Sequence, residues 1–135
     1  MAMSSRIAAF LFLLCPASLL ANPVVYTDQQ HPPANLTPET QIVWLDAPER
    51  LQRSMFGEFP ASMEQATVQA QAVMRSPQWQ QHENDLQAAY RGVVHAWEIG
   101  VRKYPAVVFD DRDVVYGTAD VAKALAYKMQ ERGRP

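Results

Sequence analysis

The chain has 135 residues, with 12 basic and 14 acidic side chains, 48% hydrophobic residues and one cysteine. The only concentration of cations is the C-terminal segment Lys128–Arg134, so we expect no direct binding of nucleic acid, which needs a clustered positive face. A single cysteine, Cys15, excludes an intramolecular disulfide and a redox-active thiol pair.

Residues 1–21 predict an export signal. Arg6 gives a positive start, residues 7–14 form a short apolar run, and a small residue, Ala21, marks the expected cleavage site. A membrane-spanning helix would need about 20 consecutive apolar residues, and Pro16 interrupts this run. We therefore expect a periplasmic protein that has no transmembrane anchor after cleavage.

Cleavage would leave residues 22–135, a length that predicts a single domain. Cys15 would leave with the signal, so the exported chain would hold no thiol for catalysis or metal ligation. Lipid attachment at Cys15 is a weaker alternative, because Leu14 stands where lipidation signals have a small residue. No cofactor is expected.

The first half of the exported chain predicts two strands and a helix. Residues 23–27 form a short apolar strand candidate, and the polar, proline-marked residues 28–40 predict a loop. The β-branched and aromatic residues 41–46 predict a second strand. The Asp46–Glu49 segment is typical of a helix start, with Asp46 as the capping acceptor, and Gly57 would end that helix.

Two further helices are predicted over residues 62–74 and 76–99. Residues 62–65 form a capping box, and both helices carry apolar stripes that predict core-facing sides. In the first helix these residues are Met63, Ala66, Ala70, Val73 and Met74. In the second, where we expect packing against a sheet, they are Trp79, Leu86, Tyr90, Val93, Val94 and Trp97.

The C-terminal part predicts a hairpin and a closing helix. Residues 106–109 and 114–116 form strands around an acidic turn, and Thr118 would cap the last helix. The turn residues Asp110, Asp111 and Asp113 resemble the start of a calcium loop but lack its glycine and distal glutamate, so a solvated turn is favoured. The inner face of the last helix would hold Val121, Ala122, Leu125 and Met129.

This order predicts an α/β fold with a mixed sheet of about four strands, flanking helices and a helical insertion before the C-terminal hairpin. Pro105, followed by a buried strand, a tight hairpin and a closing helix, resembles thioredoxin-like domains. The resemblance implies a cis peptide bond before Pro105 and a substrate groove beside it. The loop after the first strand, residues 28–32, holds no cysteine pair, so redox chemistry is not expected.

The residues predicted to bind a protein partner gather around this groove. They are Tyr26, Asp28, His31, Pro32, Tyr104, Pro105 and Tyr116. An enzymatic alternative, a thiol-free hydrolase or isomerase, would use Asp28 and His31, with Glu49 as an optional third group. His82 and His95 do not have ligand spacing with His31, so no metal site is predicted, and we expect a protein that is not an enzyme.

Several segments in order also resemble the small exported proteins of integrating conjugative elements. These segments are Tyr26–Asp28 with His31–Pro32, Leu45–Leu51, Pro105–Asp110, Val114–Gly117 and Asp120–Val121. The resemblance implies a place among the conjugative type IV secretion genes of genomic islands, in a family without an established activity. It favours an accessory protein that binds a pilin or a secretion-system protein. A structural subunit of the secretion channel is a third possibility, which a large exposed apolar patch outside the groove would favour.

Overall fold

The computed structural model describes residues 22–134, so the predicted export signal lies outside the described part. The order of strands and helices agrees with the sequence prediction. The elements are β1 (Val24–Thr27), β2 (Gln41–Trp44), α1 (Ala47–Phe56), α2 (Met63–Met74), α3 (Trp79–Glu98), β3 (Ala106–Phe109), β4 (Asp113–Tyr116) and α4 (Val121–Arg132). Within residues 22–134, no helix combines the length and the apolar character needed to cross a bilayer.

The four strands form one mixed sheet in the order β2-β1-β3-β4. Strand β1 runs parallel to β2 and antiparallel to β3, and β3 runs antiparallel to β4. Tyr26 pairs with Ala106, so the C-terminal end of β1 lies beside the start of β3. The predicted mixed α/β sheet with a helical insertion before the hairpin is therefore confirmed.

The sheet is covered on both faces, because side chains of β1 and β3 alternate between two small cores. On the face covered by α4, Val25 and Val107 pack with Phe109, Val121 and Ala124. On the opposite face Tyr26 and Val108 pack with Ala96 near the end of α3; partly buried neighbours extend this core, including Val24, Val43, Leu45, Ile99 and Val114.

Glycine at position 92 lets α3 approach the sheet closely. A Cβ atom at this position would lie 2.8 Å from Cγ1 of Val43 on β2, closer than carbon atoms pack. The valine side chain is short and branched and stands on a strand, so it has little freedom to move away. The missing side chain therefore sets the distance between α3 and β2.

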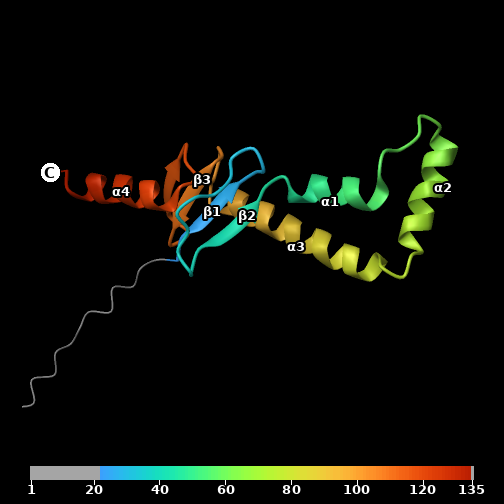
Figure 1. Cartoon of the computed structure of the whole chain (residues 1–135), viewed down its shortest axis with the longest axis horizontal. Helices are drawn as coiled ribbons and strands as arrows, with labels where there is room; N and C mark the ends of the chain where they lie inside the picture. Colours follow the sequence, from blue (N-terminus) through green and yellow to red (C-terminus); the bar gives the residue numbers. More distant parts are fainter. Residues whose placement is uncertain (1–21, 135) are drawn as a thin grey trace, which may run out of the picture.

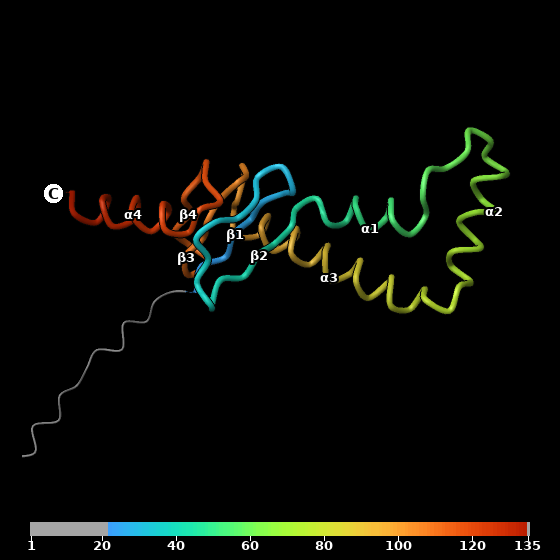
Figure 2. Tube along the Cα trace, viewed as in Figure 1, coloured from blue at the N-terminus to red at the C-terminus, as the bar shows by residue number. Residues whose placement is uncertain are grey.

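Helices α1 and α2 and the first part of α3 form a helical arm, residues 47–90, that projects away from the sheet (Figures 1 and 2). Helix α1 lies beside α3, and α2 crosses the far end. Phe56 packs against Phe59 and Trp79, with ring centroids 5.7 and 6.0 Å apart, and Gln52 Nε2 donates to the Tyr90 hydroxyl over 2.9 Å. These contacts hold the arm together without a buried core.

The predicted core-facing sides of the insertion helices are wrong in large part. No residue of α2 is buried, and Met63 is 82% exposed. Only Ala96 is buried in α3, while Trp97 is 85% exposed. The amphipathic stripes are present, but the arm extends beyond the sheet (Figure 1), and α1 covers them only in part, through contacts such as that of Phe56 with Trp79.

Two predicted helix caps are also wrong. Asp46 makes no capping hydrogen bond to α1, because its carboxylate is held by Arg50 Nε at 3.1 Å. Asp120 rather than Thr118 caps α4, accepting from the Lys123 amide over 3.0 Å. The predicted inner face of α4 is corrected as well, since Val121 and Ala124 are its buried residues and Met129 is exposed.

We expect Gly92→Ala to lower the free energy of unfolding by about 1–2 kcal/mol, because overpacking against Val43 outweighs the better helix propensity of alanine. Urea denaturation of the purified protein would measure the change. In a Val43→Ala background, which opens space for the added methyl group, the same substitution should cost much less. An equal cost in both backgrounds would contradict the close-approach explanation.

Candidate functional site

The loop that follows β1 is organised by the carboxylate of Asp28. Its Oδ1 accepts hydrogen bonds from the backbone amides of Gln30 and His31, both over 3.1 Å. The same oxygen lies 2.6 Å from Nδ1 of His31. Thr27, buried at the end of β1, donates its hydroxyl to the carbonyl of His31 over 2.6 Å. Aspartate side chains commonly close turns in this way, so the loop conformation follows from local hydrogen bonds.

These hydrogen bonds stabilise the ionised form of Asp28. The side-chain hydrogen bond from His31 is the main cause that holds the pKa of Asp28 below its ordinary value, and the two backbone amides act in the same direction. Partial burial opposes the shift without cancelling it. Asp28 is therefore a carboxylate at neutral pH, held as an acceptor within its own loop.

The structure brings this loop next to Pro105. Because Tyr26 pairs with Ala106 in the antiparallel register, Thr27 and the loop after it stand across from Pro105. The peptide bond between Tyr104 and Pro105 is cis, as the sequence resemblance implied. The ring of His31 meets the ring of Tyr104 edge to face, with centroids 6.2 Å apart and an interplanar angle of 79°.

We call this region the proline-end surface and define it by the residues that are at least partly accessible there. They are Asp28, His31, Pro32, Tyr104 and Pro105. Tyr104 is 54% exposed, although its ring packs against that of His31. The surface combines one aromatic side chain with a histidine and a carboxylate, a composition suited to contact with a polypeptide.

Two of the three tyrosines predicted to bind a partner, Tyr26 and Tyr116, do not belong to the proline-end surface. Tyr26 is only 1% exposed and packs in the core beside α3, so its prediction as a partner-binding residue is wrong. Tyr116 is partly exposed, but its hydroxyl donates to the carbonyl of Gly100 and accepts from the amide of Arg102, both over 3.2 Å. Tyr116 therefore fixes the segment that leads into Tyr104 and Pro105.

The far end of the loop is attached to the start of α4. Ala34 forms an isolated parallel bridge with Asp120, and Asn35 Nδ2 donates to Asp120 Oδ2 over 2.8 Å. The side-chain and backbone bonds to Asp120, which also caps α4, keep its carboxylate ionised: the Lys123 amide is the main cause of a lowered pKa. Residues 28–40 are thus held at both ends without a helix.

Of the three residues considered for an enzymatic site, the structure brings only Asp28 and His31 into contact. Asp28 and His31 bond to each other, while Glu49 forms its ion pair with Arg53 on the exposed side of α1. Within residues 22–134, no group of three or more histidine, cysteine, aspartate or glutamate side chains could hold a metal ion.

The acidic turn between β3 and β4 is held by ion pairs. Asp113 lies 3.1 Å from Lys128 Nζ on α4, and Lys128 is the main cause of its lowered pKa. Asp111 lies 3.2 Å from Nε2 of His95 on α3. The turn therefore links the hairpin to the helices on both faces, through Lys128 of α4 and His95 of α3.

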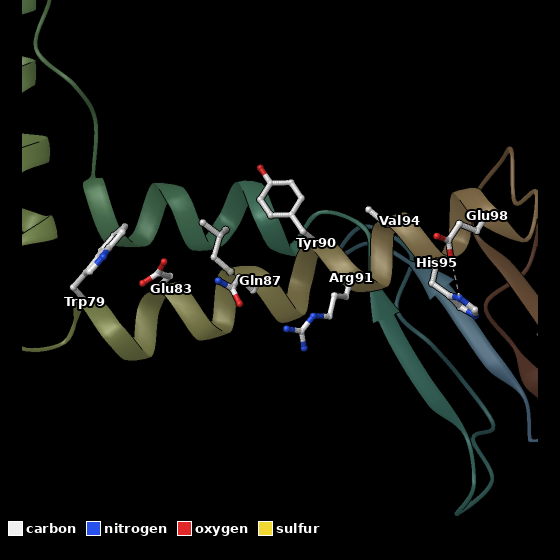
Figure 3. Close-up of a pocket in the computed structure, with 9 residues that line it drawn as sticks. Trp79, Glu83, Gln87, Tyr90, Arg91, Val94, His95 and Glu98 are labelled. Carbon is white, nitrogen blue, oxygen red and sulfur yellow. Dashed lines mark ion pairs between the residues drawn. The ribbon is translucent and has the colours of Figure 1, made fainter.

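A second accessible region lies on the side of α3 that faces away from the sheet. A hollow of about 840 Å³ follows this helix from Trp79 to Glu98, and all its lining residues belong to α3 (Figure 3). Its surface is mainly apolar through Trp79, Leu86, Tyr90 and Val94. The sequence pattern identified these residues as one stripe, but could not indicate that the sheet would leave most of them uncovered.

The strand order, the helices on both faces and the cis-proline at the start of β3 define a thioredoxin-like α/β protein without a cysteine in its described part. The profile of the family DUF1525, described as "Protein of unknown function", matches residues 20–133, and the chain belongs to this family. Neither the comparison with curated proteins nor that with solved structures gives a match.

The hydrogen bond from His31 to Asp28 predicts a measurable pH effect. A carboxylate whose pKa is lowered by folding stabilises the folded state above its unfolded pKa, near 3.8, and loses that contribution as pH falls through the folded pKa. The stability difference between the protein and its Asp28→Asn variant should therefore shrink below about pH 5. Urea denaturation at pH 6, 4 and 3 would measure it.

His31→Ala should raise the pKa of Asp28 toward its ordinary value, which a carboxyl NMR titration would detect. Gln30→Ala is the matched control, because residue 30 contacts Asp28 only through its backbone amide. An unchanged pKa of Asp28 in His31→Ala would contradict the assigned cause.

Proposed function

We propose that this protein is an exported, non-redox accessory protein that binds a protein or peptide partner at the proline-end surface. The observation that carries the proposal is the contact between His31 and Tyr104, which places an exposed aromatic ring and a carboxylate loop beside Pro105. Aromatic side chains at such positions are typical interface anchors. Because the described chain has no cysteine, binding there would involve no thiol exchange.

The sequence resemblance supports a place for this activity in conjugation. The partner would be a pilin or a secretion-system protein of an integrating conjugative element, met in the periplasm after export. An extended segment of the partner could also pair with an edge of the sheet, where β2 and β4 each have one neighbour. The proposal needs no cofactor and no metal.

A second candidate function is a structural subunit of the secretion channel. The specific observation that favours it is the set of exposed apolar side chains outside the proline-end surface, chiefly Met63 on α2 and Trp97 on α3. Exposed apolar surface of this kind commonly marks a protein–protein contact. The two functions differ in which surface holds the secretion-system partner.

We expect Tyr104→Ala to lower recovery of the partner about tenfold when the protein is captured from donor-cell periplasm, because the substitution removes the exposed aromatic anchor. A photo-reactive side chain at position 103 would identify the captured protein. Tyr127→Ala is the matched control, since Tyr127 is similarly exposed but lies on α4. Equal losses in the two variants would contradict a specific role for the proline-end surface.

The conjugative setting has its own test. Deletion of the gene should lower conjugation frequency, and a plasmid copy should restore it. Complementation by Tyr104→Ala should be poorer than by Tyr127→Ala. Undiminished transfer from the deletion strain would refute the role in conjugation, while leaving the binding measurement to stand by itself.

A further inference from the structure

The outer face of α3 has a composition that fits a second copy of itself. We define this face by Tyr90, Arg91, Val94, Trp97 and Glu98. Tyr90 and Val94 are 45% and 52% exposed, and Trp97 is more exposed than either. An exposed tryptophan beside a tyrosine and a valine is a large apolar area to leave in water.

The spacing on this face is symmetric. Tyr90 and Arg91 lie seven residues before Trp97 and Glu98, and Val94 lies midway between the two groups. Seven residues are close to two turns of helix, so both groups project from the same side. Each group joins one aromatic ring to one charge, and the two charges are opposite.

We infer that this face is the interface of a two-fold symmetric homodimer in which two copies of α3 pair antiparallel. In a two-fold interface, a residue that contacts a second residue of the partner is contacted by that residue in return. With the axis near Val94, Tyr90 of each copy meets Trp97 of the other. Arg91 of each copy meets Glu98 of the other.

The charges favour a second copy over an unrelated helix. The antiparallel arrangement creates two opposite-charge pairs and two aromatic pairs from one set of five residues. A parallel arrangement would instead place Arg91 against Arg91 and Glu98 against Glu98. Only the antiparallel pairing makes the face complementary to itself, and no such symmetry is needed to bind an unrelated partner.

The surroundings leave this face accessible. Ala96, the neighbour of Trp97, is buried against Tyr26 and Val108, so the opposite side of the helix holds α3 on the sheet. His95 Nε2 lies 3.2 Å from Asp111, and its Nδ1 lies 3.7 Å from Glu98 (Figure 3 shows the second pair). These contacts fix the end of α3 that carries Trp97, so little ordering is required on association.

Charge reversal tests the arrangement directly. Sedimentation velocity of the purified full chain over a concentration series should show a dimer. Arg91→Glu and Glu98→Arg should each raise its dissociation constant about tenfold or more, because each turns two attractive pairs into two repulsive ones. The double variant with both substitutions should dimerise like the original chain, since both pairs are restored in reversed sense.

A mixture of the two single variants gives a sharper result. One variant carries two negative charges at positions 91 and 98 and the other carries two positive charges, so together they should form a heterodimer that neither forms alone. Trp97→Ala should weaken the dimer by a similar factor, whereas Tyr104→Ala and Tyr127→Ala should not. Circular dichroism of each variant would establish that it is folded.

The inference is overturned by a chain that stays monomeric throughout the series, by single reversals that leave the dimer unchanged, or by a mixture that fails to associate. It is equally overturned if an unrelated protein occupies this face of the monomer. None of these outcomes bears on the proline-end surface, because the residues of that surface belong to other segments of the chain.

Discussion

Strands β1 and β3 are buried on both faces, and the positions of the functional surfaces depend on their register. Val25 and Val107 face α4, while Tyr26 and Val108 face α3. With four residues in each strand, a shift of one residue would send every side chain to the opposite core. The same register places Thr27 beside Pro105, so the packing of the sheet also positions the Asp28 loop.

The strands could be predicted from the sequence because their signals are local and agree with one another. Short runs of β-branched residues are bounded by turn residues, and Pro105 stands directly before the most apolar run. Asp110 and Asp111, which carry positive φ angles of 54° and 51°, suit the turn that the sequence predicted, since aspartate tolerates this conformation. The order of the helices followed from their caps and stripes.

The environment of each stripe could not be predicted in the same way. Helical periodicity identifies an apolar face, but it does not indicate whether a sheet, a second helix or another molecule covers that face. Met63, Met74 and Trp97 were therefore predicted as core residues and are exposed. The error for Tyr26 is the opposite one: it was predicted at the groove and is buried. Its position near the end of an apolar strand suggested the groove, but the alternation of side chains along the strand turns Tyr26 into the core.

Within the site, the contacts that could be foreseen differ from those that could not. The spacing of Asp28 and His31 is local, and an aspartate followed by a polar turn predicts hydrogen bonds of the kind found. The contact of His31 with Tyr104 joins segments more than 70 residues apart in sequence and depends on the pairing of β1 with β3. No local pattern encodes that proximity; the resemblance to thioredoxin-like domains, and not the residues themselves, led us to expect both side chains beside one groove.

The helical arm connects the stability of the fold to the proposed dimer. Helices α1 and α2 have 10 and 12 residues, lengths at which isolated helices are marginal in water, and α2 contributes no buried side chain. Tyr90 takes part in both the arm and the proposed interface. Its hydroxyl accepts a hydrogen bond from Gln52 of α1, while its ring lies on the outer face of α3. A second copy that covers this ring would also restrict Tyr90 to the rotamer that bonds α1. Association through α3 would therefore add to the contacts that Phe56 and Gln52 already make within the arm, and would remove apolar surface from water.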